Sequence, residues 1–322
     1  MKTKKLQVGF DIGGTNLKAG IVDHTLSILA QRSIPFRAEL GYQYTVEQMA
    51  DLMQDMLQEL GIDHQAVASI GVAVPGDIDP TGELVIHAHN LDFHSVPLRH
   101  AVSQKYPDIP VYLANDANAA ALAELHGGAL AGCRTGILLT LGTGVGGGLI
   151  LDGHMFNGGQ NHGVELGHMT LDRKGDLCTC GNRGCVETLC NAPWLIRQGQ
   201  EAILHQPDCL IAVRSSGDPN AVTAKLVLDC AKEGDAQATA IFEEYLDSLS
   251  SAIITCSNLL DPEVFAIGGG VSLAGEFLFA PLRRKVQEKS FFKHAYQILP
   301  TRMGNDAGII GAALLAQNST AS

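Results

Sequence analysis

Apolar residues occur along the chain in short runs that are separated by glycine-rich turns. Leu6–Ile12 and Leu17–Val22 flank the turn at residues 13–15, which predicts an antiparallel hairpin at the start of the chain. Residues 136–151 repeat this order of strand, glycine-rich turn and strand. The repetition predicts two structurally similar halves.

The segment after residue 44 has the apolar spacing of a helix. Thr45 and Gln48 resemble a capping box at its start, and Gly61 is a stop signal at its end. The apolar positions between them are Met49, Leu52, Met53, Met56, Leu57 and Leu60. We interpret this methionine stripe as hydrophobic core and not as a ligand-binding surface.

The rest of the chain alternates between strand and helix patterns. Strands are predicted at Ala66–Val74, Val111–Ala114, Val264–Ile267 and Tyr296–Leu299. Helices are predicted at Ala117–His126, Ala236–Leu260, about Leu273–Lys289 and Ala307 to about Gln317. Segment Pro207–Pro219 has no regular pattern, which predicts a surface loop. Polar residues that follow strands, such as Asn115 and Asp116, stand where α/β folds place their chemistry.

Composition excludes several classes of protein. The chain has 322 residues and a net charge of −12, so it lacks the basic surface by which proteins bind nucleic acids. The longest uncharged run, residues 135–151, falls short of the roughly 20 apolar residues of a membrane span. The basic start at Lys2, Lys4 and Lys5 precedes no signal-peptide pattern, so we expect a cytoplasmic protein.

Three of the eight cysteines are clustered: Cys178, Cys180 and Cys185 lie within eight positions. A disulfide framework is not expected in a cytoplasmic chain of this size. The other five, which we interpret as ordinary buried thiols, are Cys133, Cys190, Cys209, Cys230 and Cys256.

Three glycine-rich turns follow strands, at residues 11–15, 142–148 and 268–270. Glycine lets backbone N–H groups approach phosphate oxygens closely. Each turn alone is equally consistent with a plain tight turn, but the three together favour a nucleotide-phosphate site. None of them fits the Walker A or Rossmann pattern in its required context.

These turns belong to an ordered set of motifs that resembles the ROK family of sugar kinases and repressors. The motifs are Asp11–Thr15 with Asn16 and Lys18, Asn115–Asn118, Gly142–Gly148, Glu165–His168, the run from Cys178 to Glu187, and Gly268–Gly270. The resemblance implies an actin-like ATPase fold of the ribonuclease H-like class, with ATP and sugar meeting in a cleft between two lobes. The expected lobes are residues 1–118, closed by a C-terminal helix at about 304–322, and residues 119–303, with a zinc loop at 168–187.

The resemblance favours the kinase branch. The family's repressors carry an additional N-terminal helix-turn-helix domain, and here the phosphate hairpin is predicted to begin by residue 6, so such a domain is not expected. Family members are commonly dimers or tetramers, so a homo-oligomer is expected.

Asp116 is the predicted general base, because a carboxylate can accept the proton of a sugar hydroxyl as its oxygen attacks the γ-phosphorus. The alternative from the sequence alone is a helix N-cap before Ala117. Asp11 is predicted to hold Mg²⁺, directly or through water, with a cap of its own turn as the alternative.

The resemblance also implies the other site residues. Those expected at the ATP phosphates are Gly13, Gly14, Thr15, Thr143, Gly144, Gly269 and Gly270. Those expected at the sugar are Gly76, Asn90, Asn115, Asp116, Glu165, His168 and Glu187.

The three clustered cysteines and His168 form a donor set suited to a structural Zn²⁺ ion. Free thiols are the alternative, because the Cys-x-Cys-x₄-Cys spacing is tighter than that of common zinc fingers. Four protein ligands leave no open position, so zinc is expected to fix the loop rather than to catalyse phosphoryl transfer. Three glycines would let the loop wrap one ion: Gly175, Gly181 and Gly184.

The sugar is less well defined by the sequence. The family often has Pro before the position of Asn90 and Trp shortly after it, where this chain has His89 and Phe93. Glucose phosphorylation at the 6-hydroxyl is expected; the alternatives are N-acetylmannosamine, N-acetylglucosamine, mannose, fructose or allose, or a sugar sensor without turnover. His87, His89 and His94 are interpreted as a surface loop rather than a second metal site.

Overall fold

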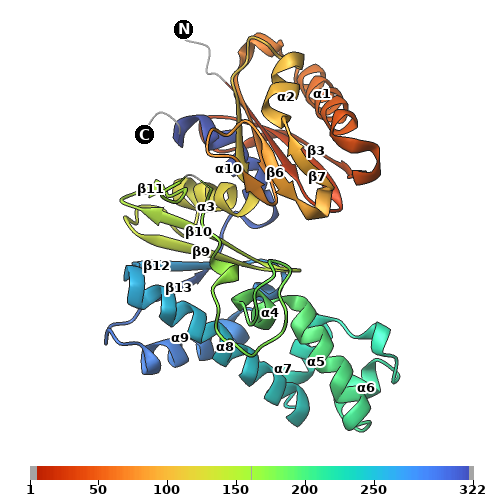
Figure 1. The fold of residues 1–322 in the computed structure, drawn as a ribbon, viewed down its shortest axis with the longest axis vertical. Coiled ribbons are helices and arrows are strands. Elements are labelled where there is room, and N and C mark those ends of the chain that lie inside the picture. The colour runs from red at the N-terminus through yellow and green to blue at the C-terminus, as the bar shows by residue number, and fades with distance from the viewer. Residues whose placement is uncertain (1–5, 161, 319–322) are drawn as a thin grey trace. The chain divides into compact units, whose positions relative to one another are not determined.

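The computed structural model describes residues 6–160 and 162–318, which form two compact units (Figure 1). The first unit comprises residues 1–134, 148–164 and 302–322, and the second comprises residues 135–147 and 165–301. The chain therefore passes between the units four times. The two lobes expected from the sequence, with boundaries at 118 and 303, stay a prediction.

The first unit is built on a five-stranded sheet in the order β3-β2-β1-β4-β8. Its strands are β1 (Leu6–Ile12), β2 (Asn16–Val22), β3 (Ile28–Pro35), β4 (Val67–Val74) and β8 (Val111–Asn115). Strand β2 is antiparallel to both of its neighbours, β1 and β3, and β4 and β8 continue the sheet in parallel with β1. The predicted opening hairpin is confirmed.

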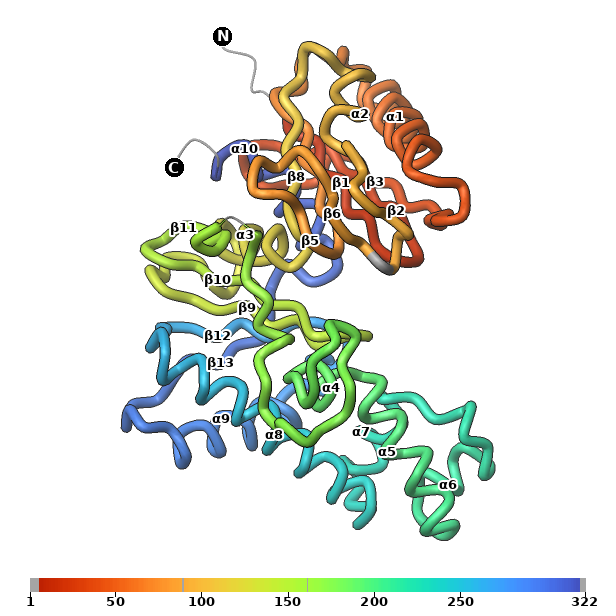
Figure 2. The backbone as a smooth tube through the Cα atoms, in the orientation of Figure 1, coloured from red at the N-terminus to blue at the C-terminus, as the bar shows by residue number. Residues whose placement is uncertain are grey.

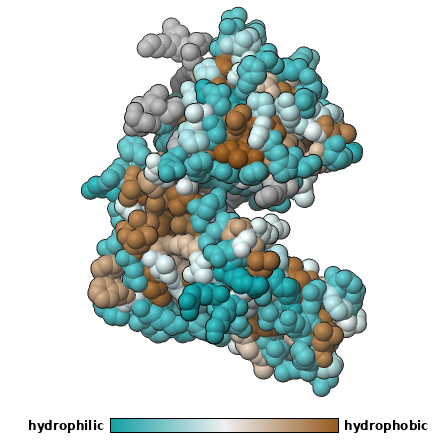
Figure 3. Space-filling model, in the orientation of Figure 1, coloured by the Kyte–Doolittle hydropathy of each residue, from teal (hydrophilic) through white to brown (hydrophobic). Residues whose placement is uncertain are grey.

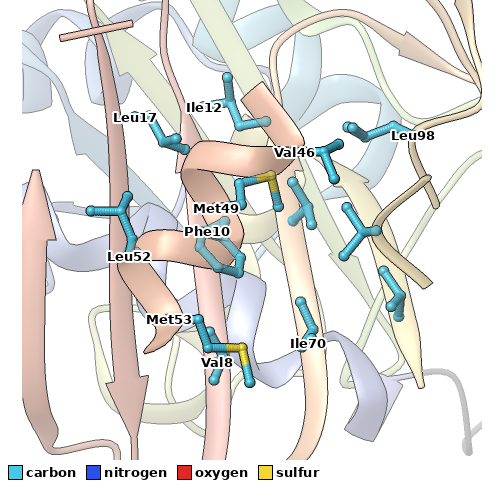
Figure 4. Close-up of a cluster of buried hydrophobic side chains, with 14 of the residues drawn as sticks. Val8, Phe10, Ile12, Leu17, Val46, Met49, Leu52, Met53, Ile70 and Leu98 are labelled. Atoms are coloured by element: carbon cyan, nitrogen blue, oxygen red, sulfur yellow. The ribbon is translucent and has the colours of Figure 1, made fainter. Parts of the chain in front are cut away.

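Helix α1 (Gly41–Leu60) covers one face of this sheet and forms its core with β1, β2 and β4. Figure 4 shows Met49 and Met53 of α1 beside Phe10 and Ile70 of the sheet. The interpretation of the methionine stripe as core is confirmed. On the face of the molecule in Figure 3, the surface over α1 and α2 (Leu98–Lys105) is mainly hydrophilic.

The predicted capping box is wrong. Helix α1 begins at Gly41, four residues before Thr45, and Leu40 is its N-cap without a side-chain hydrogen bond. Thr45 is buried inside the helix, where its hydroxyl donates to the Gly41 carbonyl at 3.3 Å. The predicted stop is right, because Gly61 ends the helix in the left-handed conformation.

Helix α10 (Ala307–Asn318) and helix α3 (Asp116–Gly127) also belong to the first unit. The backbone of α10 lies directly on the sheet: a Cβ at Gly71 of β4 would stand 1.8 Å from the Ala312 carbonyl oxygen. This packing joins the last helix of the chain to its first strands, although almost 300 residues separate them.

A small sheet of β5 (Asp77–Ile78), β6 (Val85–Ala88) and β7 (Phe93–Val96) follows β4. The predicted surface position of His87 and His94 is confirmed, because both are exposed, but they lie on strands and not in a loop. His87 and His94 are cross-strand partners on β6 and β7, with ring centroids 5.7 Å apart. A 3₁₀ helix, His89–Leu91, joins these two strands.

The second sheet has the order β11-β10-β9-β12-β13. Its strands are β9 (Gly136–Leu141), β10 (Val145–Leu151), β11 (His154–Met155), β12 (Val264–Gly268) and β13 (Gln297–Pro300). Like the first sheet, it begins with an antiparallel meander and continues with parallel strands. The predicted similarity of two halves is confirmed in this strand order.

The helices of the second unit are α4 (Val186–Cys190), α5 (Ala192–His205), α6 (Leu210–Arg214), α7 (Ala224–Lys232), α8 (Ala236–Leu260) and α9 (Glu276–Lys289). Helix α8 has the predicted bounds. Helix α9 starts later than predicted, after a 3₁₀ helix at Gly270–Ala274. The predicted loop 207–219 is wrong in part, because Ile211 and Ala212 of α6 are buried in the unit.

The five scattered cysteines are all buried free thiols, as predicted. Among residues 6–160 and 162–318, no helix has both the length and the apolar character that crossing a membrane requires.

Candidate functional site

In the first unit, the predicted site residues gather at one edge of the sheet. Strands β1, β4 and β8 are parallel, so their carboxyl ends meet at the same edge. Asp11 is near the end of β1, Gly76 follows β4, and Asn115 and Asp116 stand at the junction of β8 and α3. The regular sheet thus places two carboxylates near each other.

Asp11 lies in a tightly packed position. Its side chain is 17% exposed, and Lys18 on the neighbouring strand donates to its Oδ2 at 3.4 Å. Burial raises the pKa of Asp11, and the Lys18 ammonium opposes that rise. A Cβ at Gly308 of α10 would stand 2.6 Å from the Asp11 carboxyl group, so only glycine lets the helix approach so closely.

Asp116 is the first residue of α3, and Asn115 is the N-cap, so the alternative reading of Asp116 as the cap is wrong. Asp116 is exposed, and its Oδ1 accepts a hydrogen bond from the Ala117 N–H at 2.8 Å. The surrounding protein raises the pKa of Asp116 chiefly by desolvation, and the nearby charge of Asp11 raises it further.

The Asn115 side chain is held at both ends. Its Nδ2 donates to the Gly76 carbonyl at 3.0 Å, and its Oδ1 accepts from the Ala117 N–H at 2.9 Å. These contacts tie the end of β4 to the start of α3. Its sugar contact stays a prediction, as does that of Asn90, which is exposed on the neighbouring 3₁₀ helix.

The glycine-rich turns are closed by backbone hydrogen bonds. Gly13 N–H donates to the Asn16 carbonyl at 2.8 Å, and Gly142 N–H donates to the Gly144 carbonyl at 3.0 Å. In the third turn, Gly269 has a φ of 83°. Several turn residues that are predicted to contact phosphate are exposed, namely Gly14, Thr15, Thr143, Gly269 and Gly270.

In the second unit, His168 and the three clustered cysteines come together. One donor atom from each of the four residues lies within 4.8 Å of all the others. The Cys180 and Cys185 sulfurs are 3.7 Å apart, and the Cys178 sulfur is 3.5 Å from His168 Nδ1. Ligand atoms around a tetrahedral Zn²⁺ ion are separated by about 3.5–3.8 Å, so these residues fit that ion.

The loop that carries the cysteines wraps tightly on itself (Figure 2). Gly184 has a φ of 61°, and a Cβ there would stand 1.6 Å from the Asp172 carbonyl oxygen. Cys178 N–H donates to the Asn182 carbonyl at 2.8 Å, which closes the segment between them. Of the three glycines named from the sequence, Gly184 is therefore required by this close approach as well as by its backbone conformation.

Comparison with known proteins identifies the family. The family model described as ROK family matches residues 7–319. The chain belongs to the ROK family. It is 34% identical over 309 residues to a glucokinase of Thermotoga maritima, covering 95% of each chain. It is 32% identical to an N-acetylmannosamine kinase of Citrobacter koseri, covering 96% of this chain and 98% of the relative.

A solved ROK structure matches the fold as well. The crystal structure of a ROK family glucokinase from Streptomyces griseus in complex with glucose and AMPPNP matches with a TM-score of 0.81 and 31% identity. The match covers 97% of this chain and 99% of the other. The chain therefore has the actin-like ATPase fold expected from its motifs.

Glu165, His168 and Glu187 lie close to the cysteine cluster, and their contacts with a sugar stay a prediction. His168 Nε2 is 4.0 Å from Glu165 Oε2, while its Nδ1 faces Cys178. The imidazole thus has one nitrogen toward the cluster and one toward a carboxylate. This arrangement is compatible with the dual metal and sugar role predicted for His168.

Two residues that contact or crowd Asp11, Lys18 and Gly308, are not predicted from the sequence in that role. The pairing of Lys18 with Asp11 depends on the cross-strand register of the hairpin. That register could have been inferred from the short turn. Gly308 lies far along the chain, and no local signal connects it with Asp11.

Proposed function

We propose that this protein is an ATP-dependent hexokinase that phosphorylates the 6-hydroxyl of glucose. The observation that carries the proposal is the position of Asp116. It is an exposed carboxylate with a raised pKa, and it stands at the sheet edge that also carries Asp11 and the first phosphate turn. Membership of the ROK family and the glucokinase relatives support it.

In the proposed reaction, Asp116 accepts the proton of the sugar 6-hydroxyl as that oxygen attacks the γ-phosphorus of ATP. Asn115, locked between Gly76 and Ala117, positions the neighbouring carboxylate. Asp11 is the residue that would hold Mg²⁺, which neutralises phosphate charge when bound. The N–H groups of the glycine-rich turns bind the phosphates.

The cysteine cluster has a supporting role in this proposal. Cys178, Cys180, Cys185 and His168 would hold Zn²⁺ as a four-ligand structural site, which keeps the loop folded. Glu165, His168 and Glu187 then contact sugar hydroxyls. A homo-oligomer, either a dimer or a tetramer, is also part of the proposal.

The choice of glucose rests on the glucokinase relatives, and an N-acetylmannosamine kinase of nearly equal identity makes that sugar the main alternative. A sugar sensor without turnover is a weaker alternative. The Asn115 cap leaves Asp116 exposed next to Asp11, an arrangement that sugar sensing alone does not require.

The test is ADP formation from ATP and Mg²⁺ by zinc-replete protein with a panel of hexoses and N-acetylhexosamines, and with no sugar. The proposal predicts the highest kcat/KM with glucose and a product esterified at the 6-hydroxyl. Preference for N-acetylmannosamine would replace the substrate but keep the reaction class. The absence of turnover with every sugar, while ATP and a sugar still bind, would support the sensor instead.

A further inference from the structure

Glu187 lies between the glycine-rich turn at 142–145 and the cysteine loop, and it contacts both. It is the second residue of α4, and its Oε2 accepts a hydrogen bond from the Val145 N–H at 3.0 Å. Its Oε1 is 3.5 Å from the Thr179 hydroxyl and 3.8 Å from the Cys178 sulfur. A single carboxylate therefore connects the two segments.

This hydrogen bond fixes the orientation of one peptide group in the turn. The Gly144 carbonyl accepts from the Gly142 N–H at 3.0 Å, and the N–H of the same peptide group, that of Val145, donates to Glu187. With both ends held, the peptide plane cannot rotate without losing a hydrogen bond. The amides of Thr143 and Gly144 lie between these fixed points, where the turn offers N–H groups to a phosphate.

The turn is also enclosed by its neighbours in the second unit. A Cβ at Gly167, in the 3₁₀ helix Leu166–His168, would stand 1.9 Å from the Val145 carbonyl oxygen. Ala192 N–H at the start of α5 donates to the Gly142 carbonyl at 2.8 Å. The turn is thus packed between the segment that carries His168 and the helices that follow the cysteine loop.

The Glu187 carboxylate lies so close to Gly144 that a side chain at position 144 would displace it. A Cβ at Gly144 would stand 2.5 Å from Glu187 Oε2. Glu187 keeps further acceptor capacity, because a carboxylate offers about four lone-pair sites. One oxygen can therefore hold the turn while the other remains available to a sugar hydroxyl.

We propose that Glu187 is a positioning residue for the nucleotide, because it holds the 142–145 turn through the Val145 N–H. The proposal rests on the proposed function, because it takes the 142–145 turn as a phosphate turn. If Glu187 contacts only the sugar, substituting it leaves nucleotide affinity unchanged in sugar-free protein. If Glu187 holds the turn, the same substitution weakens nucleotide binding without sugar.

The experiment is a calorimetric titration of sugar-free, zinc-replete protein with AMPPNP and Mg²⁺. The wild-type protein is expected to bind. Glu187→Ala is expected to weaken nucleotide binding at least about tenfold, because it removes the acceptor of the Val145 N–H. Glu187→Gln keeps a side-chain oxygen for that N–H, so its nucleotide affinity is expected to stay within about threefold of the wild type.

Two further variants keep the result interpretable. Thr179→Val removes the hydroxyl near Oε1 only and is expected to bind nucleotide like the wild type. Gly144→Ala forces the carboxylate away and is expected to weaken nucleotide binding even if Glu187→Ala does not fold. Zinc content and circular dichroism, measured for every variant, identify those that have lost the metal or the fold.

The outcomes separate the two proposals. Wild-type nucleotide affinity in folded, zinc-replete Glu187→Ala, or in folded Gly144→Ala, would overturn the role of Glu187 and leave the kinase proposal standing. Failure of the wild-type protein to bind nucleotide would overturn the proposed function and this inference together. A tenfold loss in Glu187→Ala with recovery in Glu187→Gln supports the inference.

Discussion

The carboxylate pair of the first unit and the cysteine cluster of the second are positioned by different means. Asp11 and Asp116 stand at strand ends, where hydrogen-bonded neighbours fix the backbone. His168 and the cysteines stand on a loop with little regular structure, whose shape depends on glycines and turn hydrogen bonds. A regular sheet can place reacting groups by itself, whereas a loop of this kind needs a cross-link such as a metal ion.

The largest effect is expected from Asp116→Asn, which separates chemistry from folding. Loss of the general base should lower kcat by about 10²–10⁴. A carboxyl group whose pKa is higher in the folded than in the unfolded protein stabilises the folded state while it is protonated. For Asp116 this contribution is complete below pH 3.8, the ordinary pKa of the group, and it is lost as the pH rises through the raised pKa of the folded state. At neutral pH the variant should therefore be at least as stable as the wild type.

Steady-state kinetics and thermal unfolding, run on the same preparation, test this prediction. A variant with near-normal kcat would remove Asp116 from the chemistry. A variant that unfolds much more easily than the wild type would show that Asp116 is mainly structural.

Cys178→Ser tests the other side of the comparison. Removing one thiolate should release the metal and loosen the loop that carries His168 and Glu187, so sugar affinity should fall by about 10–100-fold. Metal analysis and sugar titration provide the measurement, and Cys256→Ser, at a buried thiol outside the cluster, is the matched control. Full sugar affinity in demonstrably metal-free protein would refute the coupling between metal and site.

Gly308→Ala tests how closely α10 must approach Asp11. The added methyl group overlaps the Asp11 carboxyl group, so a loss of about 1–3 kcal/mol in the free energy of unfolding is expected. Gly159→Ala, at a glycine of the same unit with open space around its Cα, should change little. Urea unfolding of both variants measures the difference; equal stabilities would mean that α10 shifts without cost.

Acidic pH should lower kcat/KM, because protonated Asp116 cannot accept the sugar proton. Since the charge of Asp11 contributes to the raised pKa of Asp116, Asp11→Asn should move the acid limb of the profile to lower pH. The measurement is the pH dependence of kcat/KM for the sugar at saturating ATP and Mg²⁺. An unchanged or higher midpoint would contradict the electrostatic account of the pair.

The smallest effect is expected from Gly181→Ala in the cysteine loop. Gly181 has a φ of 87° but open space around it, so an alanine costs only backbone strain, about 1 kcal/mol. Thermal unfolding of zinc-replete protein measures this cost. A loss comparable to that of Cys178→Ser would mean that loop conformation matters as much as the metal.

The sequence predicted much of the regular fold because patterning is local. The opening hairpin and α8 could be located from apolar spacing alone, and the glycine-rich turns marked strand ends. The start of α1 was missed because Thr45 resembles a cap, although it packs inside the helix. Helix α6 was missed because five residues are too few to show a helical period.

The site was predictable where motifs are contiguous and not where packing decides. The donor set of the cysteine cluster could be predicted from spacing and family resemblance. The capping role of Asn115 could not be separated from that of Asp116 without the backbone angles at the start of α3. The closeness of Gly308 to Asp11 depends on tertiary packing between the two ends of the chain, which no local pattern contains.

The most direct test of the account compares turnover with binding in Asp116→Asn. Glucose and AMPPNP are titrated calorimetrically into the variant, and ADP formation is measured in parallel with ATP and glucose. The account predicts binding of both ligands within about tenfold of the wild type, with turnover lowered by orders of magnitude. Turnover close to that of the wild type, or loss of binding without a separate loss of kcat, would contradict the assignment of the chemistry to this carboxylate.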